Sequence, residues 1–381
     1  MKLLRSVIFN TMPRRGALLP LLGVLIFALA ATACEPIFDN PEDCSGGLRL
    51  RFVYDYHMMY GANAFPEYVD CVTVYVFDKE GNYVAQQTET SDELRRENYR
   101  MTLNLEPGEY DIVAYGGIAC AASKFNFTPN WNEEEVRATQ NRTSMSVELP
   151  RSQFDNASGD NLHDIENRKG GLFYAAMPIT MPDAKSGYAE ETVKMKNDTN
   201  NIQVILQELN DPYRVNYDDF EYKIIDDNFI LDHNNEPVSI YSSNDFSNPP
   251  HYKPYAGGNR QAGYVDYDDL AHNGDRLNPD SLKLVQVACA ELSTSRLSMK
   301  NANTAMLIVT KKSTGEVVIR VPLITYLLFT RGWGDSWIKS DQEYLDRQHR
   351  WTLMFFLQNG MWMRTVIAIN NWVVRLNNID F

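Results

Sequence analysis

The sequence has few of the residues that build metal, redox and catalytic sites. Its 381 residues include only five cysteines and six histidines. No two cysteines have the C-x-x-C spacing, and no two histidines have the H-x-x-x-H spacing of helical zinc sites. The chain also lacks a glycine-rich phosphate loop and a nucleophile-base set. These absences favour binding or assembly over catalysis, and we predict no enzyme activity, no cofactor, no metal and no small-molecule substrate.

Positive charge is scarce, because the formal net charge is -14 at pH 7. Lys2, Arg5, Arg14 and Arg15 all lie in the first sixteen residues, which contain no acidic residue, so removing that end brings the charge to -18. A strongly acidic surface repels nucleic acid and anionic lipid headgroups. We therefore exclude nucleic acid as a partner.

Long apolar runs are also rare, and the one that exists is Ala17 to Ala33. Pro20 and Gly23 interrupt it, and a spanning helix needs about 20 apolar residues. A basic segment precedes the run and small residues end it, which is the pattern of a secretory signal peptide. We predict that residues 1–33 are this signal peptide. No later stretch is long enough to span a bilayer.

Cys34 directly follows Ala31-Thr32-Ala33, an arrangement that resembles a bacterial lipobox. In a lipobox the cysteine thiol takes a diacylglycerol, and the cysteine becomes the new N-terminus. Ala31 stands where the typical lipobox has leucine, and the alternative is an ordinary secreted protein that is cleaved nearby. Each buried methylene contributes about 0.8 kcal/mol, so a diacylglycerol plus an amide-linked chain such as palmitate holds almost irreversibly. We predict lipid attachment at Cys34.

The other four cysteines are Cys44, Cys71, Cys120 and Cys289. An exported protein tolerates disulfides, and four cysteines allow three full pairings among which the sequence does not choose. Cys71 and Cys289 lie inside strand-like runs, where a buried free thiol is at least as consistent with the pattern as a bridge.

Short strands separated by turn signals dominate the rest of the chain. In "LRLRFVYDY", Leu48, Leu50 and Phe52 alternate with Arg49 and Arg51, as in a half-buried strand. We predict hairpins in "VTVYVFDKEGNYVAQQ", in "MTLNLEPGEYDIVAYGG" and around Asn359-Gly360. A long run from 305 to 329 also has strand character, whereas residues 242–281, poor in aliphatic side chains, predict a surface excursion.

The mature chain is too long for one ordinary core, so two domains are expected. "DAKSGYAEE" interrupts the strand pattern, and we place the domains at 34–185 and 186–381. The prediction is an all-β fold of two tandem antiparallel β-sandwiches. One short helical insert is expected in "KSDQEYLDRQHRW", with Ser340 and Glu343 as a capping box and Glu343 to Arg347 as a favourable pair.

Three weaker patterns admit a functional interpretation. "GWGDSW" contains Ser336 in a form seen in some esterases, but it lies late in an all-β pattern, which favours chance. Asp266, Asp268 and Asp269 suit a calcium loop, yet the glycine and final glutamate of an EF-hand are missing, so a solvated acidic face is preferred. The tyrosine-rich segment "HYKPYAGGNRQAGYVDY" suits stacking on sugars, with Tyr252, Tyr255 and Tyr264 as candidates.

Several long motifs in one order resemble the fimbrial anchor lipoproteins of Bacteroidetes, which belong to type V pili. The first is "LRFVYDYHMMYGANAFPEYVDCVTVYVFDKEGNYV", which follows the cysteine of the lipobox. The later ones are "AELSTSRLSM", "DQEYLDRQHRWTLMFF" and the closing "INNWVVRL". The resemblance covers nearly the whole mature chain.

The resemblance implies a lipoprotein of the outer membrane with two transthyretin-like sandwiches, placed at the base of a fimbrium. Such a protein fixes the filament to the cell surface and helps limit its length, with the stalk pilin as its partner. Only Cys34 carries over with a defined role, as the lipidated residue. Contact with the pilin is expected by β-strand addition or at a sheet edge, involving the final strand 372–376. The alternative is a surface adhesin or glycan-binding lipoprotein.

Overall fold

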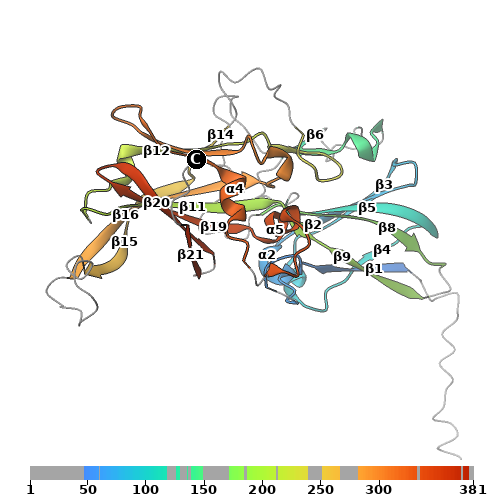
Figure 1. Cartoon of the computed structure of the whole chain (residues 1–381). Coiled ribbons are helices and arrows are strands. Elements are labelled where there is room, and N and C mark those ends of the chain that lie inside the picture. Colours follow the sequence, from blue (N-terminus) through green and yellow to red (C-terminus); the bar gives the residue numbers. More distant parts are fainter. Residues whose placement is uncertain are drawn as a thin grey trace, which may run out of the picture.

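The computed structural model describes residues 47–59, 61–117, 126–128, 135, 139–148, 171–183, 187–211, 213–238, 251–266, 282–332, 335–369 and 372–376. Figure 1 shows the strands in two groups that lie side by side, with α2 and α5 between them. None of the helices in these ranges has the length and hydrophobicity that a membrane crossing needs. The predicted signal peptide and Cys34 lie outside the described residues.

The first group is a sandwich of a three-stranded sheet, in the order β4-β1-β9, on a five-stranded sheet, in the order β10-β8-β5-β2-β3. Leu48, Leu50 and Phe52 of β1 point into the core between the sheets, while Arg49 and Arg51 face solvent, as predicted. The strands are β1 (Gly47–Val53), β2 (Val72–Phe77), β3 (Tyr83–Glu89), β4 (Met101–Leu103), β5 (Gly108–Gly116), β8 (Phe173–Met181), β9 (Tyr188–Lys194) and β10 (Lys196–Asn197).

Strand β2 is buried along its whole length, because both faces of its sheet are covered. Val74 faces the sandwich core, whereas Tyr75 belongs to a separate apolar cluster that contains Val147 and Leu231. This second cover is a small sheet in the order β13-β7-β6. Its strands are β6 (Asn126–Thr128), β7 (Ser146–Glu148) and β13 (Ile230–Leu231). Since β13 comes from the second half of the chain, this sheet joins the two halves.

The second group packs a six-stranded sheet, in the order β15-β16-β11-β19-β20-β21, on a four-stranded sheet, in the order β14-β12-β17-β18. Its core is the largest in the chain and includes Trp351, Phe355 and Tyr222. The strands are β11 (Thr199–Glu208), β12 (Phe220–Ile225), β14 (His251–Tyr252), β15 (Ala256–Asp266), β16 (Leu282–Ser295), β17 (Met306–Lys311), β18 (Val317–Pro322), β19 (Arg350–Gln358), β20 (Met361–Ile369) and β21 (Trp372–Leu376).

Two of the predicted hairpins are confirmed. β2 pairs with β3, and β19 pairs with β20 through Asn359 and Gly360, whose φ angles of 56° and 78° are those of a tight hairpin turn. The hairpin predicted over 101–116 is wrong. β4 pairs with β1, while β5 pairs with β2 and β8 in the other sheet. A turn sequence specifies a chain reversal, but it does not specify which sheet the next strand joins.

The helical insert is confirmed as α5 (Asp341–Arg347). The Ser340 hydroxyl accepts a hydrogen bond from the Glu343 amide at 3.1 Å, and the Glu343 carboxylate accepts one from the amide of Lys339 at 2.9 Å. The predicted Glu343–Arg347 ion pair is present at 2.8 Å.

Among the described residues, two further helices were not expected, the short α2 (Phe65–Tyr68) and α4 (Leu323–Leu328). The strand character predicted for residues 305–329 therefore fails at its end. Leu323, Ile324 and Tyr326 are buried on several sides of the α4 turn, and periodicity alone does not separate such a short apolar run from a buried strand.

The all-β sandwich prediction is confirmed, but the sheets are not purely antiparallel. β1 pairs with β9 and β11 pairs with β19, both in parallel. The sequence pattern does not reveal this, because burial periodicity is the same in both orientations. A transthyretin-like topology remains a prediction.

Residues 188–197 follow the predicted boundary at 185, yet they pair with the first sandwich. β9 lies against β1, β10 lies against β8, and β11 then enters the six-stranded sheet. One extended segment therefore runs through three sheets without a linker. We propose a boundary near Asp198 between the domains.

The predicted excursion at 242–281 contains regular structure in its described part. β15 pairs with β16 over residues 256–266 and forms an end strand of the six-stranded sheet. Its polar and glycine-rich composition suits a strand with one open edge.

Candidate functional site

The predicted lipid-attachment residue, Cys34, lies outside the described residues, as do Cys44 and Cys120. Cys71 is disulfide-bonded, whereas Cys289 is a buried free thiol. Cys71, which directly precedes β2, and Cys289, on β16, therefore differ, and the partner of Cys71 is not among the described residues.

Ser336 is exposed in a turn before α5. The carboxylate of its neighbour Asp335 accepts a hydrogen bond from the Gly332 amide at 2.9 Å, which stabilises that turn. The acidic residue beside the serine thus has a local structural role, in agreement with the interpretation of this motif as a chance match.

The described residues contain no group of three or more histidines, cysteines or carboxylates placed to hold a metal ion. His57 is buried and accepts a hydrogen bond from the Met59 amide at Nδ1, while its Nε2 donates to the Ala62 carbonyl at 2.9 Å. Burial lowers the pKa of His349 to about 4, and its Nδ1 lies 3.3 Å from the Tyr54 hydroxyl. Both histidines thus take part in packing and local hydrogen bonds.

The tyrosine set proposed for glycan stacking does not form one surface. Tyr252 is fully buried, stacks on Phe229 at 4.5 Å and donates a hydrogen bond to Asn228. The hydroxyl of Tyr255 donates to the Glu291 carboxylate at 3.2 Å. Tyr264 lies on β15. Tyr252 is therefore wrong as a stacking residue, because its strand β14 covers the core of the second sandwich.

The end strands of the sheets are the first candidate functional feature among the described residues. β18 ends the four-stranded sheet and β21 ends the six-stranded sheet. β18 also contacts β20, so these two ends lie on the same side of the second sandwich. Val317 of β18 is 44 % exposed and Met361 of β20 is 50 % exposed. We call this region, with Phe329 after α4, the C-terminal edge patch.

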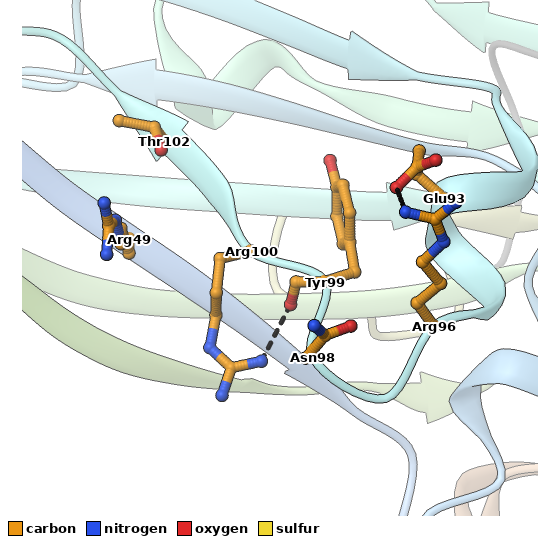
Figure 2. Close-up of a pocket in the computed structure, with 7 residues that line it drawn as sticks. All are labelled: Arg49, Glu93, Arg96, Asn98, Tyr99, Arg100 and Thr102. Carbon is orange, nitrogen blue, oxygen red and sulfur yellow. Dashed lines mark hydrogen bonds and ion pairs between the residues drawn. The ribbon is translucent and has the colours of Figure 1, made fainter.

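A second feature is an arginine pocket of about 440 Å³ on the first sandwich, shown in Figure 2. The segment that leads into β4 supplies most of its lining, and Arg49 of β1 completes it. Arg49 is the register partner of Thr102, which places it against this segment. The lining residues are Arg49, Glu93, Arg96, Asn98, Tyr99, Arg100 and Thr102.

A third feature is a pocket of about 630 Å³ between the two sandwiches. The guanidinium of Arg347 lies 4.0 Å from the ring centre of Tyr56 and 4.9 Å from that of Trp337. These stacked groups join the segment after β1 to helix α5, so we interpret this pocket as part of the junction between the sandwiches.

A network of buried charges lies beside the same junction, within the second half of the chain. Arg296 makes two hydrogen bonds of 2.9 Å to the two carboxylate oxygens of Asp346, and its side chain is 8 % exposed. It also donates to the Asn235 carbonyl, and the Asn235 amide donates to Asp198 at 2.7 Å. Burial raises the pKa of Asp198 to about 7, an effect that the nearby Arg296 partly offsets. This network was not predictable from the sequence, because its members are far apart in the chain.

The fold and these features define a two-part β-sandwich protein with open strand edges and, in the part that the structure describes, no assembled catalytic set. The family model described as fimbrillin-A associated anchor proteins Mfa1 and Mfa2 matches residues 41–378. The chain therefore belongs to this family of fimbrial anchor proteins. A comparison with curated protein sequences gave no match.

Three solved structures show the same fold. A candidate adhesin of Bacteroides thetaiotaomicron is 36 % identical, with a TM-score of 0.69 over 87 % of this chain and 98 % of that chain. A candidate polysaccharide-binding protein of the same species is 26 % identical, with a TM-score of 0.64 over 87 % and 98 %. The fimbrial anchor protein Mfa2 of Porphyromonas gingivalis is 17 % identical, with a TM-score of 0.57 over 87 % and 99 %, and this likeness concerns the fold alone.

Proposed function

We propose that this protein is a non-enzymatic lipoprotein of the outer membrane that anchors a fimbrium to the cell surface and helps limit its length. The observation that carries the proposal is the family match over residues 41–378, which begins seven residues after Cys34. A chain of this family that starts beside a lipobox-like cysteine has the parts that an anchor needs, an attachment point and a folded body.

The lipid on Cys34 holds the protein at the membrane in this proposal. Gly47, the first residue of β1, lies 13 residues after Cys34. A fully extended segment of that length spans at most about 45 Å. The first sandwich is therefore held close to the bilayer, and the second sandwich is free to face the filament.

The stalk pilin binds at the C-terminal edge patch. An end strand exposes unpaired N–H and C=O groups that accept a partner strand, and exposed apolar side chains beside it add specificity. β21 is an end strand, and β18 lies on the same side of the sandwich. This arrangement supports addition of a pilin strand or contact of a pilin surface at this edge.

The test combines attachment and stalk contact in cells that carry the native fimbriae. Mass spectrometry of the N-terminal peptide reports whether Cys34 carries acyl chains, and a Cys34→Ala variant serves as the unanchored control. Deletion of residues 370–381 removes β21 and is expected to release fimbriae into the medium while the truncated protein stays in the membrane. Fimbriae that remain attached after this deletion would refute the role of the last strand.

An adhesin that binds glycans is the second candidate function. The names of the two relatives from Bacteroides thetaiotaomicron favour it. Tyr252 does not contribute, since it is buried, so the test uses Tyr255→Ala with Tyr213→Ala, at an exposed site outside the tyrosine-rich segment, as the control. Glycan binding that is lost only in the first variant, with fimbriae still anchored, would favour the adhesin.

A further inference from the structure

The charge of the arginine pocket is opposite to that of the whole chain. Its lining holds three arginines and one glutamate, Glu93, whereas the chain carries a net charge of -14. Glu190 adds one negative charge beside Arg100, and the exposed Arg51 adds one positive charge. The hydrogen bond from Arg100 lowers the pKa of Glu190, and Arg51 lies close enough to lower it further. The pocket is therefore a local cationic site on an acidic protein.

The arginines of the pocket are held in place by contacts that leave donors free. The guanidinium of Arg49 lies 4.0 Å from the ring centre of Tyr188. Arg100 forms an ion pair with Glu190 at 2.8 Å and donates to the Tyr99 carbonyl at 2.8 Å, and Arg96 forms an ion pair with Glu93 at 2.6 Å. A guanidinium has five N–H donors, so one or two contacts leave others for a ligand. Figure 2 shows Arg96 and Arg100 on the segment that leads into β4 and Arg49 on the neighbouring strand.

We propose that the arginine pocket binds the phosphate group of an anionic lipid headgroup of the membrane that carries the protein. Guanidinium groups match phosphate oxygens in paired hydrogen bonds, which distinguishes an arginine cluster from a general positive charge. The membrane as the source of the phosphate rests on the proposed function, whereas the phosphate chemistry rests on the pocket alone.

The position of the pocket supports the headgroup as its ligand. Arg49 lies 15 residues after Cys34, so the attached lipid keeps the pocket within reach of the bilayer. Tethering makes the second contact intramolecular, with an effective concentration of about a millimolar, so a weak site suffices. The acidic residues elsewhere predict repulsion from anionic headgroups. That repulsion is screened beyond a Debye length of about 8 Å, and contacts inside the pocket decide the local interaction.

The experiment measures phosphate and vesicle binding by the mature chain without acyl groups. The probes are inorganic phosphate and vesicles of phosphatidylcholine, alone or mixed with phosphatidylglycerol. The first variant combines Arg49→Gln and Arg100→Gln. The second carries Arg96→Gln alone, and because the Arg96 side chain is 65 % exposed, we expect this change to leave folding intact. Arg320→Gln, at an exposed position on β18, is the control.

We expect the wild-type protein to bind phosphate and the vesicles that contain phosphatidylglycerol. The double variant is expected to bind both probes at least about tenfold more weakly, since each lost contact to a charged group contributes substantially to binding. The Arg320→Gln control is expected to bind them as the wild type does. Binding of phosphate without binding of vesicles would overturn the lipid as ligand in favour of free phosphate. Binding of neither probe, or equal weakening in the control, would overturn the site itself.

The phosphate site and the lipid anchor can be refuted independently of one another. Unmodified Cys34 in cells, together with intact phosphate binding by the pure protein, would refute the lipid anchor, and with it the membrane as ligand, and leave the phosphate site standing. Lipidated Cys34 together with no phosphate binding would refute only the pocket.

Discussion

The junction between the two sandwiches and the C-terminal edge patch differ in almost every physical respect. At the junction, Arg296 and Asp346 have side chains that are 8 % and 5 % exposed and satisfy each other through two hydrogen bonds. At the edge patch, Val317 and Met361 are 44 % and 50 % exposed. Arg296 directly follows β16 and Asp346 lies on α5, so this buried pair fixes two segments of the second half of the chain to one another. At the edge patch, by contrast, apolar side chains stay exposed.

The largest effect is expected from breaking the buried ion pair beside the junction. Arg296→Ala leaves the buried carboxylate of Asp346 without its charged partner, with only the Gln342 amide still bonded to it, and such a loss costs about 3–5 kcal/mol of unfolding free energy. Urea denaturation measures it. Lys79→Ala is the matched control, because the Lys79–Glu109 pair is 43 % and 70 % exposed, and it should cost about 1 kcal/mol or less. Similar values for the two variants would contradict stabilisation of this region by buried charge.

The next effect is a pH dependence that arises at the same junction. Burial raises the pKa of Asp198 to about 7, so the folded state holds a proton that the unfolded state has released above pH ~4. Stability from this group is present below pH ~4 and is lost as pH rises to about 7. Asp226, whose pKa is also raised to about 7 by burial, acts in the same direction.

His349 acts in the opposite direction. Burial lowers its pKa to about 4, so its contribution to stability is lost as pH falls from about 6.5 to 4. Thermal unfolding of wild type and Asp198→Asn across pH 4–8 separates the contribution of Asp198 from that of His349. The difference in unfolding free energy between the two proteins should change with pH over about pH 4–7 and be constant above it. A difference that does not vary with pH would show that Asp198 is ionised throughout.

A third prediction compares the edges of the two sandwiches. Val317→Lys places a charge on β18, and Val84→Lys places one on β3, where the valine is 40 % exposed. Both should change stability by about 0.5 kcal/mol or less, since surface substitutions have small effects. Pilin capture should fall about tenfold for Val317→Lys, or ~1.4 kcal/mol, and stay unchanged for Val84→Lys. The reverse pattern would move the stalk contact to the first sandwich.

The smallest effect concerns the helix that carries Asp346 to the junction. Ser340→Ala removes the hydroxyl that accepts from the Glu343 amide, and loss of such a cap costs about 1 kcal/mol. Chemical denaturation measures the unfolding free energy of this variant. Ser336→Ala, at an exposed position in the preceding turn, is the control. An equal loss in both would mean that the cap does not stabilise α5.

Local structure was largely predictable from the sequence. β1, the β2–β3 and β19–β20 hairpins and α5 each carry a short-range signal, such as the alternation of Leu48 and Arg49 or the pair Asn359-Gly360. The sheet choice of β4 and β5 was not predictable, because the Pro107-Gly108 turn is compatible with staying in one sheet or crossing to another. α4 was missed because its six residues are apolar on most sides.

The candidate sites were predictable only in part. Arg49 and Arg51 stand out as the polar face of β1, and Arg95, Arg96 and Arg100 lie close together in the sequence, so the arginine pocket had a visible signal. The pair Arg296–Asp346 and the buried position of Tyr252 depend on contacts between distant segments. A single sequence does not reveal such contacts, because burial of a polar residue is decided by the partner that reaches it.

The most direct test of the anchor function is a pull-down of the native protein from gently solubilised outer membrane. The captured complex is separated without heating and identified by mass spectrometry. We expect a heat-sensitive ladder of pilin subunits with wild type, and release of that complex from the cell in the Cys34→Ala variant. Capture of the lipidated protein alone, with no pilin, would refute the anchor function.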